Sequence, residues 1–93
     1  MRTINYTSRF KKDYKREKSG HHGKALDHLL EDILQQLVFD KQLPQRNADH
    51  PLSGEWSDHR DCHIKPDLIL IYRKDDENNL ILVRLGSHSE LGL

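Results

Sequence analysis

Apolar side chains follow the period of an α-helix over residues 24–38. The gaps between them alternate between one and three positions, with acidic and amide side chains on the other side, which predicts a one-faced helix. An earlier segment carries a narrower apolar stripe at Phe10 and Tyr14 among lysines, and Thr7 or Ser8 offers its N-cap. Only a few residues separate the two segments, so we expect a helix hairpin.

Four shorter segments, residues 2–6, 56–64, 68–74 and 80–86, have the alternating or continuous apolar pattern of β-strands. Short turns join the last three, which requires antiparallel neighbours because a parallel pair needs a long crossover. Residues 40–55 are polar, contain two prolines and are expected to form a loop. The order predicts an α+β fold, β-α-α-β-β-β, in which the helix hairpin packs on one face of a small, mainly antiparallel sheet.

The length and composition of the chain fit one domain, residues 1–93. Of these residues 34% are hydrophobic and 32% are charged, which favours a compact fold with one core. The longest apolar run is far too short to cross a membrane, and no secretory signal is visible at the start. The single cysteine, Cys62, excludes an internal disulfide and suits a reducing compartment. We therefore expect a cytoplasmic protein without a membrane partner.

Charge is balanced over the whole chain but not along it. The formal net charge is +0, yet residues 1–24 hold eight Lys or Arg against two acidic residues, and the remainder is acidic. The basic segment indicates a surface for nucleic acid or an acidic partner, or else a solvated helix face. The neutral total argues against strong non-specific binding of nucleic acid.

Histidine and aspartate side chains recur on the predicted strands, and the strand period of two decides which of them share a face. If Cys62 faces the helices, Asp61 and His63 lie on the open face of the sheet. Arg84 and His88 share one face of the last strand, and they join the others if the pairing register allows. A β-bulge would shift either parity.

These residue types suit cleavage of RNA without a metal, by attack of its own 2′-hydroxyl on the adjacent phosphate. The reaction needs a base, an acid and positive charge at the phosphate, and imidazole can serve as either acid or base near neutral pH. The candidate acid–base residues are His50, His63 and His88, with Asp67 to orient an imidazole or to accept the proton. The candidate phosphate contacts are Arg84, Arg60 and Lys65.

Each candidate also has an ordinary structural interpretation. Asp67 suits a turn, and Trp56 suits the core or its rim before it suits a platform for a base. Cys62 is expected to be a small buried apolar side chain, and His59 and the pair His21-His22 are expected at the surface. Metal binding competes for the same imidazoles, but the spacing lacks a zinc signature, and we predict no metal or other cofactor.

Three segments of the second half of the chain resemble the YafQ branch of the RelE/ParE superfamily of bacterial toxins. They read DHPLSGEW at 49–56, RDCHIKPDLILIY at 60–72 and LVRLGSHSEL at 82–91. A strand, a helix hairpin and a loop precede them in the order of that family. The resemblance covers nearly the whole chain and is most specific over residues 49–91.

The resemblance implies a toxin of a type II toxin–antitoxin system that cuts messenger RNA in the ribosomal A site without a metal. It implies three partners: the ribosome with its mRNA, a cognate antitoxin, and operator DNA that only the toxin–antitoxin complex binds. By position, the family's catalytic residues fall on His50, His63, Asp67 and His88. The residues expected to support or bind the substrate are Arg84, Asp61, Arg60, Lys65 and Trp56.

Two positions depart from the family pattern. Relatives often carry an aromatic residue directly after the aspartate, where this chain has Leu68, and a phenylalanine one residue past the SEL motif, where it has Gly92. Loss of these stacking groups is expected to weaken substrate binding or to change the codon preference. Two alternatives stay open: a non-catalytic toxin of the ParE type that poisons gyrase, and an inactive member that acts only in operon autoregulation. The several histidines count against the first, because a binding module has no need of proton donors.

Overall fold

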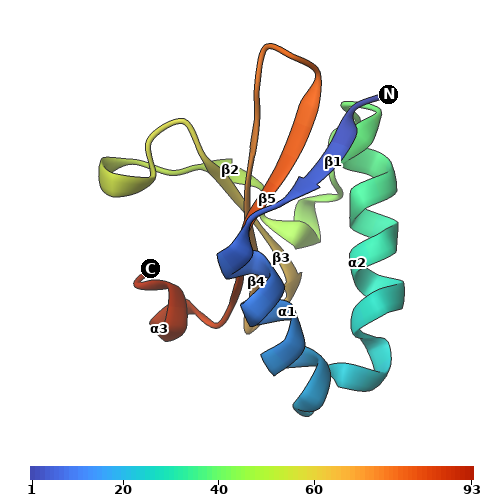
Figure 1. Cartoon of the computed structure of the whole chain (residues 1–93), viewed down its shortest axis with the longest axis vertical. Coiled ribbons are helices and arrows are strands. Elements are labelled where there is room, and N and C mark those ends of the chain that lie inside the picture. The colour runs from blue at the N-terminus through green and yellow to red at the C-terminus, as the bar shows by residue number, and fades with distance from the viewer.

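The computed structural model describes all 93 residues and shows a five-stranded sheet between a helix pair and a short third helix (Figure 1). The helices are α1 (Ser8–Ser19), α2 (Gly23–Val38) and α3 (His88–Leu91). The strands are β1 (Thr3–Tyr6), β2 (His50–Pro51), β3 (Arg60–Lys65), β4 (Leu68–Lys74) and β5 (Asn79–Gly86), and two 3-10 helices, η1 (Gln45–Asn47) and η2 (Gly54–Trp56), flank β2. The strand order is β1-β5-β4-β3-β2, and only β1 runs parallel to its neighbour. The predicted α+β fold with its helix hairpin is confirmed.

The α1–α2 hairpin covers one face of the sheet with a continuous apolar core. The side chain of Thr7 accepts a hydrogen bond from the Phe10 N–H and so caps α1, which buries Phe10 against the sheet. The apolar stripe of α2 packs in the same cluster as alternate strand residues, among them Cys62, which is completely buried. Burial of these side chains is the main source of stability, and it holds the hairpin against β3, β4 and β5.

The turn of the hairpin is tight and depends on a glycine. A Cβ atom at Gly23 would lie 2.1 Å from the Lys18 carbonyl oxygen, which no side chain tolerates. Across the hairpin, Lys18 Nζ lies 2.7 Å from Asp27 Oδ2, and the Tyr14 hydroxyl donates to the same carboxylate. His22, expected at the surface, is only 9% exposed, and its Nδ1 has no partner. That expectation is wrong, because the close approach of the helices leaves the residue little contact with solvent.

The other face of the sheet, called the open face below, carries a smaller apolar cluster. Three of its members are completely or almost completely buried and three pack against them: Ile69, Ile71, Leu91, Leu52, Trp56 and Val83. Because Leu91 belongs to α3, this cluster holds α3 on the side of the sheet opposite the hairpin (Figure 1).

A register shift between β4 and β5 decides which side chains of β5 reach the open face. Tyr72 pairs with Leu82 but Ile71 pairs with Arg84, so that Val83 is an extra residue in β5. Leu82 therefore packs in the main core, whereas Arg84 comes to the open face beside Ile71. Arg84 lies on the face predicted for it because a β-bulge shifts the register, and the sequence pattern does not show where this bulge lies.

Two elements near the open face differ from the predicted ones. Strand β3 begins at Arg60, later than predicted, because η2 turns the preceding segment and Asp58 adopts a φ of 69°. His88 is the first residue of α3 and does not continue β5, because Ser87 forms a capping box with Glu90 and starts a helix. His88 thus approaches the open face from a helix and not through the strand period.

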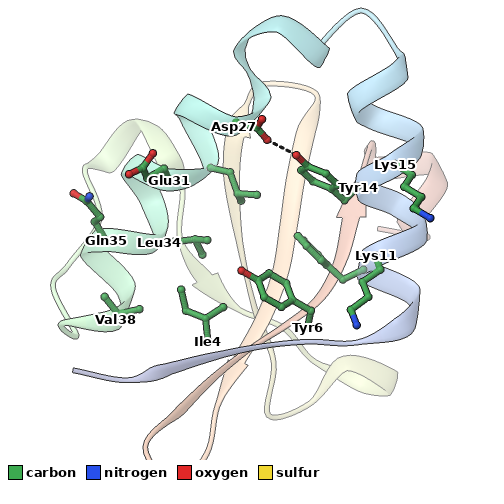
Figure 2. A pocket seen from close by; sticks show the side chains of 12 residues that line it. Ile4, Tyr6, Lys11, Tyr14, Lys15, Asp27, Glu31, Leu34, Gln35 and Val38 are labelled. Atoms are coloured by element: carbon green, nitrogen blue, oxygen red, sulfur yellow. Dashed lines mark hydrogen bonds between the residues drawn. The ribbon is translucent and has the colours of Figure 1, made fainter.

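A groove of about 670 Å³ opens between α1, α2 and β1 (Figure 2). Its lining is mainly apolar and includes Ile4, Phe10, Leu30, Leu34 and Val38. Tyr6, Lys11, Lys15 and Glu31 also line it. The Tyr6 residue is 50% exposed, and β1 is an edge strand of the sheet. The groove is therefore an uncovered apolar surface beside a free strand edge.

Candidate active site

Four residues form a row across the open face, one from each of four neighbouring strands. His50 of β2 pairs with Asp61 of β3, and Asp61 pairs with Ile71 of β4. Ile71 in turn pairs with Arg84 of β5. Neighbouring strands lie about 4.8 Å apart, so paired residues are immediate neighbours on one face. The row places an imidazole at one end and a guanidinium at the other.

A second row brings in the other two predicted histidines. His63 pairs with Ile69, and Ile69 pairs with Gly86 at the end of β5. The chain then enters α3, and the His88 ring lies edge-on to the His63 ring, with 5.2 Å between ring centres. Histidines from β2, β3 and α3 therefore meet in one place, although they lie far apart in the sequence.

Asp61 is the buried acidic group of this cluster. The residue is 3% exposed, and burial raises the pKa of its carboxyl group, while the charged forms of His50, His63 and His88 act to lower it. Asp61 is therefore in electrostatic contact with all three histidines of the site. Asp61 is expected from the sequence among the substrate contacts, but its burial suits it better to act on the imidazoles.

The neighbours of His50 determine which of its ring nitrogens carries the proton. Nδ1 lies 2.8 Å from the Ala48 carbonyl oxygen and 3.0 Å from Asp61 Oδ1. A carbonyl oxygen can only accept, so Nδ1 is protonated, and its alignment with Ala48 leaves Asp61 Oδ1 without a well-directed hydrogen bond. In the neutral ring Nε2 then keeps its lone pair. The side chain is 53% exposed, so a substrate can reach Nε2.

Two side chains fix the loop before β2 to the strands of the site. The Asp49 carboxylate accepts hydrogen bonds from the Tyr72 hydroxyl at 2.6 Å and from Arg60 Nε at 3.3 Å. Burial and the contact with Asp49 raise the pKa of Tyr72, which therefore stays a donor. The buried Asn47 amide donates to the His63 carbonyl oxygen at 2.8 Å, beside the register shift in β3. These contacts hold β2 in register with β3.

Arg84 enters the first row as one half of an ion pair with Asp13 of α1. Its Nε and Nη2 donate to the two carboxylate oxygens at 2.7 and 3.2 Å. The Leu85 N–H and Arg16 Nη1 also donate to Asp13, both at 3.0 Å. Burial alone would raise the pKa of Asp13, but these donors outweigh it and hold the pKa below its ordinary value. The pair leaves Nη1 of Arg84 uncommitted.

A cleft of about 630 Å³ adjoins Arg84 on the open face. It is lined by residues of α1, the loop before β3, β5 and α3, including Arg9, Leu52, Trp56, Arg84, Ser89 and Leu91. Trp56 packs on the smaller apolar cluster and meets the His59 ring edge-on, with 5.3 Å between ring centres. Two of the predicted substrate contacts, Trp56 and Arg84, thus share one cleft.

The other predicted site residues lie at the edge of this arrangement. Asp67 is exposed in the turn between β3 and β4, and its side chain has no hydrogen-bond partner within the chain. Lys65 ends β3 just before that turn and is half-buried. The Arg60 guanidinium is held by Asp49. The structure gathers the three histidines with Asp61 but does not bring these three side chains into the same cluster.

Neither a membrane-spanning helix nor a metal-binding cluster is present. No helix combines the length and apolar character needed to span a membrane. No group of three or more His, Cys, Asp or Glu side chains is arranged to hold a metal ion. Cys62 lies in the main core, where burial raises the pKa of its thiol, so it is the small buried side chain expected from the sequence.

Two acidic residues contribute to the site that the sequence does not single out. In the sequence, Asp13 is only one acidic residue within a basic helix. Its contact with Arg84 joins residues that are 71 positions apart. Asp49 reads only as part of a motif, although it anchors the loop that carries His50. The only feature of the sequence that could have pointed to Asp13 is its position as an acidic residue among the lysines of an amphipathic helix.

The chain matches a known protein family over almost its whole length. A family model described as "Bacterial toxin of type II toxin-antitoxin system, YafQ" matches residues 2–92. Among curated proteins, the "mRNA interferase toxin YafQ" of Escherichia coli strain K12 is 37% identical over 93 residues, which cover 98% of this chain and 96% of that protein.

Solved structures of related proteins share the whole fold. The crystal structure of the Escherichia coli DinJ-YafQ complex contains a chain that superposes with a TM-score of 0.84 at 35% identity, covering 98% of both chains. A metal-bound toxin from Helicobacter pylori superposes with a TM-score of 0.82 at 40% identity, covering 98% of this chain and 99% of that one. The similarity therefore extends over the sheet and both of its helix layers.

Proposed function

We infer that this chain, which belongs to the YafQ family of toxins of bacterial type II toxin–antitoxin systems, is an mRNA interferase, an endoribonuclease that cuts messenger RNA. The main structural support for RNA cleavage is the group of three histidines around buried Asp61: His50, His63 and His88. Arg84 lies in the same row across the sheet as His50 and Asp61. A toxin that only bound gyrase would need no such set of proton-transferring groups. The curated relatives named mRNA interferases also favour the nuclease over the gyrase poison.

The proposed reaction breaks the RNA backbone without a metal. The 2′-oxygen of a ribose attacks the adjacent phosphorus, and the bond from phosphorus to the 5′-oxygen of the next nucleotide breaks. The products are a 2′,3′-cyclic phosphate and a free 5′-hydroxyl. A base takes the proton of the 2′-hydroxyl, and an acid gives one to the leaving 5′-oxygen. Positive charge stabilises the phosphate oxygens between these two events.

The geometry supports a separate role for each residue of the cluster. His50 is the proposed base, since its exposed Nε2 keeps a lone pair. His88, exposed at the start of α3, is the proposed acid, and the His63 ring packs edge-on beside it and limits how its imidazole can turn. Asp61, buried beside these rings, places a carboxyl group next to the imidazoles that transfer protons. Arg84 offers its uncommitted Nη1 to the phosphate.

We place the RNA along the open face, from the histidines to the cleft. Trp56 offers an aromatic surface on which a base can stack, and Arg9 adds a charge that no acidic side chain pairs. Lys65 and Arg60 of β3 lie outside the histidine cluster, so we propose that they act on the RNA only at longer range, through their positive charge. Asp67, exposed and with no hydrogen-bond partner for its side chain, is free to orient an imidazole or to accept a proton.

Inducible expression in a bacterial host tests this assignment. The wild-type chain is expected to arrest growth and to create new 5′ ends in mapped transcripts. His88→Ala should lose cleavage by about 100-fold or more, as is typical when a general acid is removed. His59→Ala, which changes a histidine outside the cluster, is the matched control and should remain toxic. A His88→Ala variant that still arrested growth and cut transcripts would rule out the assignment, and trapped gyrase complexes would favour the alternative.

We propose that cleavage takes place in the ribosomal A site and that α1 makes the ribosomal contact. Among the basic residues of α1, Arg16 and Lys18 are paired with acidic side chains. Lys12 is exposed and unpaired, and Lys11 and Lys15 stand at the groove of Figure 2. Replacing Lys11, Lys12 and Lys15 with glutamate should weaken co-sedimentation with ribosomes. Unchanged co-sedimentation would show that α1 is not the contact.

The protein partner is an antitoxin, and we propose that the groove of Figure 2 receives one of its apolar segments. Grooves of this kind bind the apolar face of a helix, and the free edge of β1 can pair with a strand. Tyr6→Glu should abolish neutralisation by the cognate antitoxin, and repression of the operator by the complex with it, while toxicity persists. Phe39→Glu is the matched control, since Phe39 is 56% exposed but does not line the groove. Loss of neutralisation in both variants, or in neither, would contradict this placement.

A further inference from the structure

Asp13 is a carboxylate of the basic helix α1 that is buried against β5. It is 4% exposed, and its two oxygens accept four hydrogen bonds, two from Arg84 and one each from Leu85 and Arg16. An arginine side chain has many rotamers, and a two-point contact with a fixed carboxylate selects one of them. The contact therefore determines where the Arg84 guanidinium lies at the end of the first row.

Arg16 continues this network from α1 to α3. Its Nη2 donates to the Leu85 carbonyl oxygen at 2.8 Å, and its Nε lies 3.1 Å from Glu90 Oε2. Glu90 also accepts the Ser87 N–H at 2.9 Å and so forms the capping box that starts α3. A Cβ atom at Gly86 would lie 2.9 Å from Arg16 Nη2 and 3.2 Å from Glu90 Oε1. The absence of a side chain at Gly86 gives Arg16 the space to reach both partners.

We propose that Asp13 and Arg16 are positioning residues for RNA cleavage, in which Asp13 orients Arg84 and Arg16 holds the first turn of α3 that carries His88. The proposal rests on the function proposed above. Neither residue belongs to the histidine cluster, and both act through the residues that they hold. The basic helix thereby acquires a second role beside any ribosomal contact.

The energetics of buried ion pairs favour a role in geometry. The cost of removing both charges from water offsets much of their attraction, so a pair such as Asp13–Arg84 adds little stability beyond what apolar side chains in the same place would give. Its clear effect is to fix a side chain that would otherwise sample several rotamers. In an active site a displacement of about 1 Å can lower the rate about 100-fold. Loss of Asp13 or Arg16 is therefore expected to affect the rate of cleavage more than ribosome affinity.

The experiment compares Asp13→Asn, Arg16→Gln and Gly86→Ala with two controls, Asp32→Asn and Arg46→Gln. Asp32 and Arg46 are exposed and lie outside the network. The cleavage rate constant and the half-saturating ribosome concentration are measured on ribosomes that carry a defined mRNA. Thermal melting reports stability, and the Nε–Hε NMR signal of Arg84 reports its hydrogen bond to Asp13.

We expect Asp13→Asn to lower the cleavage rate constant at saturating ribosomes about 10- to 100-fold. The half-saturating ribosome concentration should change less than about twofold. The Arg84 Hε proton should exchange with solvent faster than in the wild type. Arg16→Gln and Gly86→Ala should show the same split, while the controls cleave as the wild type does. A wild-type rate constant in Asp13→Asn despite loss of Arg84 Hε protection would overturn the proposal.

Two further outcomes keep the proposal separate from the function on which it rests. If Asp13→Asn fails to fold, Arg16→Gln and Gly86→Ala decide, and wild-type rate constants in both would overturn the role of the network. If the wild-type chain itself does not cut ribosome-bound mRNA, the proposed function fails. The exchange rate of the Arg84 Hε proton then still shows whether Asp13 orients this side chain, and unchanged exchange in Asp13→Asn would contradict it.

Discussion

Among single residues, Asp61 shows most clearly a conflict between stability and chemistry. Its carboxyl group is buried, its Oδ1 lacks a well-directed hydrogen bond, and burial raises its pKa. Ionisation of such a group opposes folding, because the folded state prefers the protonated form. Its position beside three imidazoles explains why this loss of stability is retained, since catalytic groups are often kept at the expense of stability.

The variant Asp61→Asn tests this conflict. With a raised pKa in the folded state, Asp61 favours folding below its unfolded pKa of about 3.9, and this contribution is lost as the pH rises through the folded pKa. At pH 8 the variant should therefore be more stable by about 1 kcal/mol, or about 4–8 °C in melting temperature for a domain of this size. Its cleavage should fall at least about tenfold. A lower melting temperature at pH 8, with exposed Asp32→Asn as control, would contradict the account.

Residues of the site were predictable where they obey the strand period. Asp61 and His63 share the open face because Cys62 between them belongs to the main core. The contact of Asp13 with Arg84 was not predictable, because it depends on how α1 docks on β5. The protonated nitrogen of His50 was not predictable either, because it depends on the backbone position of one carbonyl group.

At the scale of elements, the sequence indicates long periodic segments and misses short ones. Both helices of the hairpin and the three main strands were predicted, since each shows one or more full periods of its pattern. Strand β2 has two residues and α3 has four, too few for any period to be visible. Both short elements carry a histidine of the site, so the prediction was weakest where the chemistry is concentrated.

The hairpin depends on Gly23, and its replacement tests how tightly the two helices must approach. Gly23→Ala should destabilise the fold by about 1–3 kcal/mol, as overpacking does, because the new Cβ would overlap the Lys18 carbonyl oxygen. Gly20→Ala is the matched control, since a Cβ there would meet its nearest atom at 3.5 Å, an ordinary contact. Chemical denaturation of the two variants measures the difference. Equal stability would show that the hairpin can open without cost.

For the molecule as a whole, acidic side chains with lowered pKa values dominate the response to acid. Hydrogen bonds from Lys74 and Arg2 lower the pKa of Asp40 to about 2. Asp13 and Asp75 also have lowered pKa values, the latter through hydrogen bonds with Asn79. Exposed pairs such as those of Asp40 contribute little and are screened by salt, so the buried Asp13 pair should be the least sensitive to ionic strength.

The stability of the chain should therefore fall in acid. A group with a lowered folded pKa stabilises the fold above its unfolded pKa, about 3.9 for aspartate, and this stability is lost as the pH falls through the folded value. The melting temperature should decrease from pH 5 to pH 2.5, and Asp13→Asn should show a smaller decrease than the wild type. Melting curves across this range in high salt measure the effect. A decrease of the same size in Asp13→Asn would show that Asp13 is not a main contributor.

The architecture places the two proposed binding surfaces on opposite faces of one sheet. The hairpin side offers an apolar groove, whereas the open face carries the histidines, Arg84 and the cleft. A protein partner and an RNA substrate can thus be recognised by different surfaces of the same small domain.

The chemistry of the cut ends tests the central claim most directly. Ribosome-bound mRNA is cleaved with the purified chain, and the ends of the two fragments are identified by mass spectrometry. Attack by the 2′-hydroxyl with histidine acid–base catalysis predicts a 2′,3′-cyclic phosphate on the upstream fragment and a 5′-hydroxyl on the downstream fragment. A 3′-hydroxyl with a 5′-phosphate would mean that water attacked the phosphate, and would contradict the roles given to His50, His63 and His88.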